Sequence, residues 1–332
     1  MTSNRGGIAR SYLAVACCVL AAATAVLFDG CRTAPPVESA PAATKSAGPG
    51  WPMRLKDVLG ATIELSGPAK RVVSLSPNLT EIVCFVGGID QLVGVTEFDK
   101  YPPEILSKPK MGGIINPSLE KVVAAKPDLV LVARGLDRGL IDRLKSQGVQ
   151  VFGSDPRNLD DVLALSDQIA KILGREAEAK PKLDALRAQI AKTEKELARP
   201  EVKPKALVVI EVDPLFVAGD GSFVDDLLHR AGFTNAAAGS KPWAQWSSER
   251  LIAANPDVIF LVQEHGQISR GMDPDLAARL KARSPWSDLK AVQAGDLFPV
   301  TDDYVTIPGP RLALGLDELV KIRSQYLSHA GP

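Results

Sequence analysis

The sequence "SLEKVVAAKPDLVLV" at residues 118–132 returns in a close copy as "SSERLIAANPDVIFL" at residues 247–261. Each copy has Ser shortly before Glu, then Ala-Ala, Pro-Asp and a continuous apolar segment. Ser favours the start of a helix, the residue before Pro disfavours helix, and a fully apolar run is typical of a strand buried on both faces. We therefore expect the same helix-strand unit in each half of the chain.

Helix and strand signals alternate around both copies. Apolar runs at 71–76, 128–133 and 149–154 alternate with segments of helical periodicity, and the second half opens with another apolar run at 205–212. This alternation indicates an α/β fold with two Rossmann-like lobes, each built on a mostly parallel sheet. Pro, Gly and small residues predict loops at 213–222 and 233–247.

The segment between the two copies has the periodicity of long helices. Residues 159–200 are helical in pattern, with a break at Gly174 and Pro181 inside the second run. An ordinary surface helix would have this pattern too, but its position predicts a rigid link between two lobes. We expect an N-terminal lobe at 51–158, linking helices at 159–200 and a C-terminal lobe at 201–332, with a ligand cleft between the lobes.

The first fifty residues differ from the rest. Arg5 and Arg10 precede the uncharged stretch 11–28, which predicts an export signal over residues 1–30. The following "LFDGC" resembles the bacterial lipobox and implies lipidation at Cys31, although a plain signal or an uncleaved anchor fits as well. Residues 31–50 are rich in Pro, Ala, Ser and Gly, which predicts a flexible tether. All three alternatives place the body outside the cytoplasm.

Composition and motifs exclude several classes of function. Lys plus Arg (39) balance Asp plus Glu (39), so no net field favours nucleic acid. The chain has none of the common nucleophile, nucleotide or metalloprotease motifs, and its three His are far apart. We therefore expect neither an enzyme nor a resident metal or cofactor. Cys84 lies in an apolar context and is expected to be a buried hydrophobe.

What remains is a set of aromatic and special residues in loops that follow predicted strands. Ligands of α/β proteins bind at the carboxyl ends of the strands, where such loops meet. The alternative for the tryptophans is that they fill the base of a lobe. The candidate ligand-binding residues are Pro77, Asn78, Phe98, Tyr101, Arg134, Phe216, Trp243, Trp246 and Arg311.

Together these segments resemble the helical-backbone periplasmic binding proteins of ABC importers, the family that captures cobalamin, ferric siderophores and haem. The resemblance covers Arg54 to Lys321, and its segments keep the family's order. They are "KRVVSLSPNLTEIVCFVGG", "VGVTEFDKYPPE", "MGGIINPSLEKVVAAKPDLVL", "FVAGDGSFVDDLLHRAGFTNAA" and "WSSERLIAANPDVIFL".

Within that family, "DKYPPE" and "KPWAQWSSE" are most similar to the cobalamin-binding branch. The likeness implies that Tyr101, Phe216, Trp243 and Arg311 line a corrinoid site. The chain departs from that branch at Ala133, where an aromatic residue often precedes Arg-Gly. A siderophore or haem is therefore the alternative ligand, whereas Tyr101 and Tyr304 alone are too few phenolates for a bare ferric ion.

The resemblance also gives the repeated phrase a function. In the family, a Glu at this place in each lobe docks on the membrane permease, which implies that role for Glu120 and Glu249. A Glu favoured by the helix dipole alone is the alternative. The expected protein is thus a monomeric substrate-binding lipoprotein that works with an ABC permease and its ATPase, or else a receptor lipoprotein without a transport role.

Overall fold

The computed structural model describes most of the body of the chain. The expected export signal and Cys31 lie outside the described part, as does the tether up to residue 49. The described residues are 50–197, 202–262, 275–300 and 303–330.

The first lobe is built on a parallel sheet with the strand order β4-β3-β5-β6. The register places Val72 opposite Leu129 and Leu131 opposite Phe152, and all four side chains are buried. An antiparallel pair, β1 and β2, packs beside β6. The elements are β1 (Met53–Lys56), β2 (Thr62–Leu65), β3 (Val72–Ser74), α1 (Pro77–Phe85), η1 (Ile89–Gln91), β4 (Leu92–Gly94), η2 (Pro103–Ser107), α2 (Leu119–Ala124), β5 (Leu129–Ala133), α3 (Arg138–Ser146) and β6 (Gln150–Ser154).

The second lobe has a mixed sheet in the order β10-β8-β7-β11-β12, with β9 also paired to β7. Its pairs β7–β11, β11–β12 and β7–β9 are parallel, whereas β8 runs antiparallel to both β7 and β10. The elements are β7 (Lys205–Val212), β8 (Leu215–Ala218), α6 (Phe223–Arg230), β9 (Thr234–Asn235), β10 (Trp243–Gln245), α7 (Ser248–Ala254), β11 (Val258–Val262), α8 (Leu276–Lys281), η4 (Trp286–Asp288), α9 (Lys290–Ala294), β12 (Leu297–Val300), η5 (Asp303–Val305) and α10 (Leu312–Ala330).

The stretches 213–222 and 233–247 were expected to be loops, and that prediction was wrong in part. They contain the short strands β8, β9 and β10. These strands have two to four residues each and obtain their hydrogen bonds from β7 and from one another. Such short strands are set by their pairing partners rather than by local propensity.

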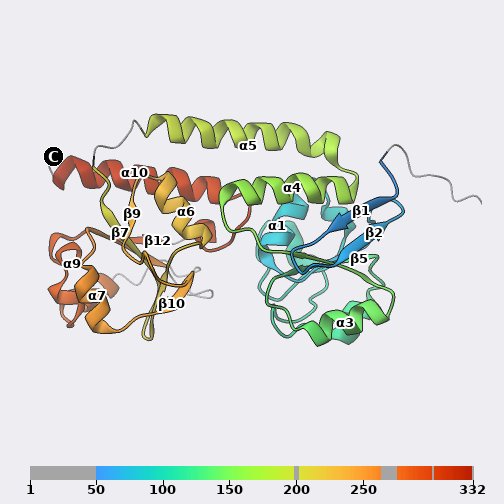
Figure 1. Cartoon of the computed structure of the whole chain (residues 1–332), viewed down its shortest axis with the longest axis horizontal. Helices are drawn as coiled ribbons and strands as arrows, with labels where there is room; N and C mark the ends of the chain where they lie inside the picture. The colour runs from blue at the N-terminus through green and yellow to red at the C-terminus, as the bar shows by residue number, and fades with distance from the viewer. Residues whose placement is uncertain (1–49, 198–201, 263–274, 301–302, 331–332) are drawn as a thin grey trace, which may run out of the picture. The chain divides into compact units, whose positions relative to one another are not determined.

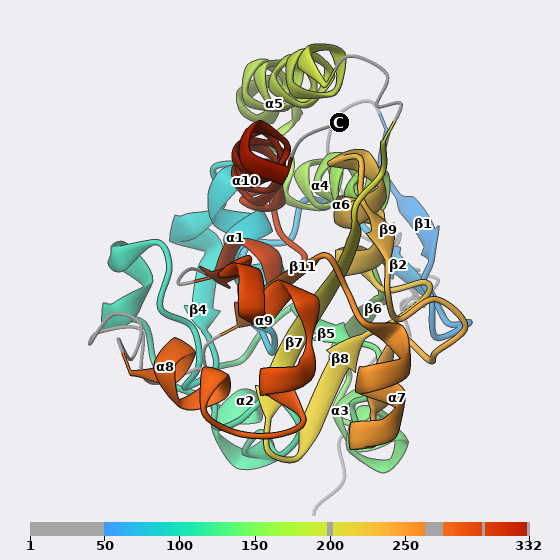
Figure 2. The ribbon, with the colours of Figure 1, turned by 90° about the vertical axis from the view of Figure 1, so that its left-hand side faces the viewer.

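Two linking helices join the lobes. α4 (Leu159–Leu173) packs on α1 of the first lobe and on α6 of the second, and α5 (Glu176–Glu196) packs on α4 and α10. Figures 1 and 2 show α5 along one edge of the body, with α4 and α10 beneath it. Gly174 closes α4 at φ 66°, a left-handed conformation that glycine adopts without strain. The fold is therefore two α/β lobes bridged by long helices, as expected.

A single arginine fastens this link to the second lobe. Arg230 of α6 pairs with Asp226 at 2.9 Å, with Glu194 of α5 at 2.6 Å and with Asp160 of α4 at 2.5 Å. Asp226 also accepts the N–H of Leu159, the first residue of α4, at 2.9 Å. Because one guanidinium holds three helices, the linking helices and the second lobe form one packed block.

The repeated phrase forms the same unit in each lobe, as predicted. α2 leads into β5 and α7 leads into β11. The Ser118 hydroxyl accepts the N–H of Lys121 at 3.3 Å, and the Ser247 hydroxyl accepts that of Arg250 at 3.4 Å. Both helices are thus capped by the Ser of the phrase.

The Asp of each Pro-Asp pair fastens the neighbouring strand. Asp128 accepts the backbone N–H of Lys70 at 2.8 Å and that of Arg71 at 3.1 Å, just before β3. Asp257 accepts the N–H of Lys205, the first residue of β7, at 2.7 Å. The phrase therefore sets both a helix start and the entry of the adjacent parallel strand.

Candidate functional site

A cavity of about 360 Å³ opens at the carboxyl ends of β3, β5 and β6. The first lobe contributes residues that follow these strands, and the second lobe contributes the N-terminus of α6 and the edge strand β10. This is where α/β proteins place ligands. The lining is Ser76, Asn78, Ala133, Arg134, Ser154, Asp155, Pro156, Arg157, Gly221, Ser222, Phe223, Pro242, Trp243 and Pro308.

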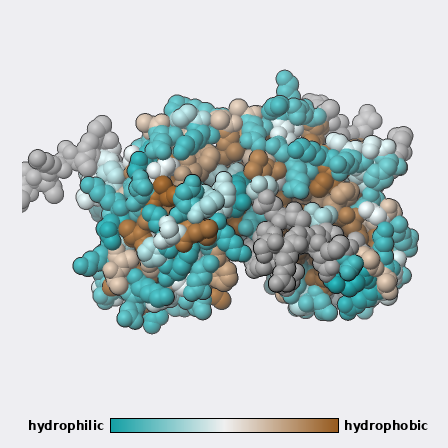
Figure 3. Space-filling view, turned by 180° about the vertical axis from the view of Figure 1, so that it is seen from behind, coloured by the Kyte–Doolittle hydropathy of each residue, from teal (hydrophilic) through white to brown (hydrophobic). Residues whose placement is uncertain are grey.

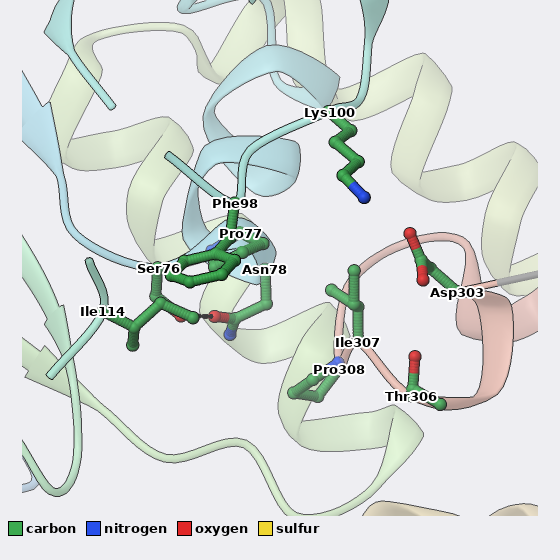
Figure 4. A pocket seen from close by; sticks show the side chains of 10 residues that line it. All are labelled: Ser76, Pro77, Asn78, Phe98, Lys100, Ile114, Asp303, Thr306, Ile307 and Pro308. Atoms are coloured by element: carbon green, nitrogen blue, oxygen red, sulfur yellow. Dashed lines mark hydrogen bonds between the residues drawn. The ribbon is translucent and has the colours of Figure 1, made fainter. Parts of the chain in front are cut away.

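A second cavity, of about 250 Å³, shares Ser76, Asn78 and Pro308 with the first. The two are therefore adjacent compartments of one cleft lined by both lobes. Figure 4 shows the ring of Phe98 close to Pro77 and Asn78, with the loop 303–308 of the second lobe opposite. The 250 Å³ cavity is also lined by Lys100, Ile114, Asp303, Thr306 and Ile307.

The start of α1 lies at the junction of the two compartments. Pro77 occupies the first turn, where its missing N–H costs nothing. Ser76 does not cap the helix; its hydroxyl instead donates to Asn78 Oδ1 at 2.6 Å. Asn78 is 5% exposed, so its side chain is held in place at the floor of the cleft.

Aromatic side chains form much of the wall contributed by the second lobe. Trp243 is 49% exposed, and its ring centroid lies 5.4 Å from that of Phe223. Phe98 on the opposite lobe is also 49% exposed. Exposed large rings that line a cavity provide apolar contact area at low entropic cost. Figure 3, seen from behind, shows a mainly hydrophilic surface with separate hydrophobic patches.

A third cavity, of about 350 Å³, is lined by Tyr101, Glu81, Arg311 and residues of α5 and α10. Arg311 Nε donates to Glu81 Oε2 at 3.0 Å, and its guanidinium lies 4.1 Å from the ring centroid of Tyr101. Burial raises the pKa of the Glu81 carboxyl, and Arg311 only partly offsets this. The pair crosses from α1 to the loop before α10, so it ties the two lobes together.

The structure brings most of the predicted ligand residues to these three cavities. Pro77 and Phe98 line the 250 Å³ cavity, Arg134 and Trp243 line the 360 Å³ cavity, and Asn78 lines both. Tyr101 and Arg311 line the third.

Phe216 and Trp246 line none of these cavities. Phe216 lies half-buried on β8, opposite Gln245. Trp246 is 6% exposed within the second lobe's core, and its Nε1 donates to the Ser240 hydroxyl at 3.1 Å. The tryptophan that fills a lobe is thus Trp246, and the one that faces the cleft is Trp243.

Sequence reasoning missed several polar lining residues. Ser154 is the last residue of β6 and Asp155 follows it, and Ser222 caps α6 directly before the aromatic Phe223. Their position directly after predicted strands or before a predicted helix was the available signal. Small polar residues at such places are common, however, and only the folded chain shows which of them face one cavity.

Asp155 and Cys84 are ionisable residues that line two of these cavities. Asp155 forms ion pairs with Arg134 Nε at 2.7 Å and with Arg157 at 3.0 Å. The Cys84 thiol, in the third cavity, has its pKa raised to about 12 by burial, so it stays protonated and unreactive at neutral pH. Within the described ranges, no three His, Cys, Asp or Glu side chains converge as metal ligands.

Glu120 and Glu249 are both exposed, in the first turns of α2 and α7. Hydrogen bonds from the Ser247 side chain lower the pKa of Glu249, which therefore carries its charge. In Figure 2, α2 and α7 lie at the end of the body opposite α5. Among the helices that the structure describes, none is long and apolar enough to cross a bilayer.

Comparison with known proteins gives a matching family and individual relatives of similar sequence. Residues 72–304 match the periplasmic binding protein family. The chain is 28% identical over 304 residues to an uncharacterised ABC transporter substrate-binding lipoprotein of Bacillus subtilis, covering 90% of this chain and 93% of the relative. It is 29% identical over 259 residues to the vitamin B12-binding protein of Salmonella typhimurium, covering 77% and 91%.

A solved structure shares the fold. The periplasmic haem-binding protein RhuT from Roseiflexus sp. RS-1, in its apo form, superposes with a TM-score of 0.68 at 27% identity. The match covers 78% of this chain and 99% of that one. The similarity thus includes proteins named for two different ligands, vitamin B12 and haem.

Proposed function

The chain belongs to the periplasmic binding protein family, and we propose that it captures a corrinoid outside the cytoplasm and hands it to an ABC importer. Members of this family are substrate-binding transport proteins rather than enzymes. They deliver their ligand to a membrane permease with an attached ATPase. The proposal concerns which ligand this chain carries and which residues hold it.

The observation that carries the proposal is the aromatic lining of a cleft made from two adjacent compartments. Phe98 from one lobe lines one compartment, and Trp243 from the other lobe lines the adjacent one, where its half-exposed ring packs against the buried Phe223. A corrin is a broad amphipathic disc, and flat side chains on both sides suit its faces. The vitamin B12-binding relative at 29% identity supports this choice.

Haem is the second candidate, and a specific contact favours it. Tyr101 is 46% exposed, and the guanidinium of Arg311 lies over its ring. A phenolate is a known axial ligand of ferric haem. The haem-binding structure at 27% identity supports this alternative. A ferric siderophore, or a receptor role without transport, is a weaker alternative.

The remaining assignments follow from the proposed role. We propose that Pro77, Asn78, Phe98, Arg134 and Trp243 contact the ligand, and that Glu120 and Glu249 contact the permease.

Lipidation at Cys31 after removal of residues 1–30 would hold the protein at the membrane through the tether 31–50. Labelling with a radioactive fatty acid should then be lost on Cys31→Ser.

Absorbance spectroscopy tests the ligand directly. The purified protein is incubated with cobalamin, haem and a ferric hydroxamate siderophore, passed through a desalting column, and its spectrum recorded. We expect the corrin bands to be retained at one ligand per chain. Retention of the haem spectrum alone would select the second candidate, and absence of any retained chromophore or thermal shift would reject the proposal.

A further inference from the structure

The 360 Å³ cavity carries more positive than negative charge. Arg134 and Arg157 line it, and Asp155 is the one carboxylate among its lining residues. Both guanidiniums bind the same oxygen, Asp155 Oδ2. Each arginine has five N–H donors, so donors remain on both for another acceptor.

The N-terminus of α1 lies at this cavity and lacks the groups that usually compensate the positive end of a helix dipole. α1 has no acidic residue in its first turn and no side-chain cap. The neighbouring α4 and α6 have both, with Asp160 and Asp161 in one first turn and Asp225 and Asp226 in the other. The positive end of the α1 dipole is therefore available to a group in the cleft.

Two polar side chains at the same cavity have an unused hydrogen-bond donor. The Ser154 hydroxyl has no hydrogen-bond partner in the described part of the chain, although the residue is only 2% exposed. Asn78, 5% exposed, uses its Oδ1 to accept from Ser76, while its Nδ2 has no partner among the residues that the structure describes. Buried donors in native proteins are nearly always satisfied, so the Ser154 hydroxyl points to a missing acceptor, and Asn78 Nδ2 is a second available donor at the same cavity.

We infer that this compartment of the cleft binds an oxyanion carried by the ligand, a carboxylate or a phosphodiester. The oxyanion would accept from Asn78 Nδ2, the Ser154 hydroxyl and the free donors of Arg134, at the positive end of α1. This inference rests on the proposed function and narrows it to large amphipathic ligands that bear an acidic group. The aromatic wall would hold the apolar part of the same molecule.

Pairs of ligands that differ in their acidic group distinguish binding at this subsite from binding elsewhere in the cleft. Cobalamin is compared with cobinamide, which lacks the nucleotide phosphodiester, and ferric protoporphyrin with its dimethyl ester, which lacks the free carboxylates. Dissociation constants for all four are measured by quenching of tryptophan fluorescence on the wild type, Arg134→Gln and Ser154→Ala. Arg138→Gln, an exposed position on α3 outside every cavity described above, is the control.

Arg134→Gln should weaken binding of the acid-bearing probe about 10-fold, and leave its neutral analogue within about 2-fold. Ser154→Ala should show the same preference without lowering the thermal midpoint, because the hydroxyl has no partner to lose. The corrin pair identifies a phosphodiester as the bound group, and the porphyrin pair identifies a carboxylate.

Two results would overturn the inference in distinguishable ways. If the wild type binds its ligand but Arg134→Gln and Ser154→Ala weaken the acidic and neutral probes equally, the oxyanion subsite is wrong and the proposed function stands. If the wild type binds none of the four probes, the proposed function is wrong and this inference falls with it. A loss in Arg138→Gln as large as in Arg134→Gln would show a non-specific charge effect and would also reject the subsite.

Discussion

Glu81 and Arg311 form an ion pair that joins the two lobes beside the cleft. The Glu81 side chain is 3% exposed and that of Arg311 is 14% exposed, so neither charge is well solvated. Burial raises the pKa of Glu81 even with the guanidinium beside it. A buried pair of this kind adds little net stability, but loss of one partner leaves an uncompensated charge.

Arg311→Met should therefore destabilise the protein in a pH-dependent way. Without the cation, the pKa of Glu81 rises further, and the folded state holds a proton that the unfolded state releases. Stability then falls as pH rises above the ordinary glutamate value. We expect a loss of about 3 kcal/mol at pH 8 and a smaller loss at pH 5, measured by urea unfolding.

The double variant Glu81→Gln with Arg311→Met is the control for this prediction. It removes the titrating group, so the extra loss between pH 5 and pH 8 should disappear. A single variant that loses equal stability at both pH values would contradict the assignment to Glu81.

Trp243 and Trp246 are three positions apart, and we expect their substitution by Ala to affect different properties, ligand binding in one case and stability in the other. Trp243→Ala removes a half-exposed ring from the cleft and should weaken ligand binding by at least ~1 kcal/mol with little effect on unfolding. Trp246→Ala removes a buried ring and should lower the free energy of unfolding by about 3–5 kcal/mol. Ligand titration and urea unfolding on both variants measure the two effects, and a reversed pattern would contradict the site.

The two tryptophans also show what the sequence could not reveal. Both lie in a stretch expected to be a loop, and each was a candidate for the ligand site. Their orientation depends on β10, a strand of three residues whose register against β8 places Trp243 opposite Ala218. The partner strand β8 is separate from β10 in the sequence. A shift of this register by one residue would turn each side chain of β10 to the opposite face of the sheet.

At the scale of elements, the repeated helix-strand phrase was predictable because its signals are local. The capping Ser, the Pro and the apolar run act within the phrase itself, and both copies fold as expected. The role of its Asp was not predictable in the same way. The groups that Asp128 binds lie 57 and 58 residues earlier, at the entry to β3.

Asp128 and Glu120 offer a matched test within one copy of the phrase. Asp128→Ala should lower the free energy of unfolding by about 1–3 kcal/mol, because it leaves the N–H groups of Lys70 and Arg71 without their acceptor. Glu120 is exposed and has no such bond to any residue that the structure describes, so Glu120→Ala should change stability by less than about 0.5 kcal/mol. Urea unfolding of both variants measures this, and equal losses would contradict the division of roles.

At the scale of the molecule, the contacts between helices limit how far the cleft can open. Arg230 fastens α6 to α4 and α5, and α4 in turn packs on α1 of the first lobe. The Glu81–Arg311 pair adds a direct tie between the lobes. Such a frame favours a largely preformed site over a large hinge closure. Such a frame would also hold α2 and α7 apart at one separation, as the proposed contact of Glu120 and Glu249 with a permease requires.

The docking role of Glu120 and Glu249 is tested by reversing both charges. The variant Glu120→Lys with Glu249→Lys should bind ligand with unchanged affinity, since neither residue lines the cavities described here. Ligand uptake by cells that rely on this protein should fall at least 10-fold, because like charges would face the basic residues expected on the permease.

A matched reversal separates docking from a general charge effect. Glu176 and Glu196 lie at the two ends of α5, at the end of the body opposite α7 in Figures 1 and 2, so Glu176→Lys with Glu196→Lys makes the same change in net charge there. Uptake should then remain near the wild-type rate. Normal uptake in the Glu120 and Glu249 variant, or equal loss in both, would show that the two glutamates serve only their helix starts.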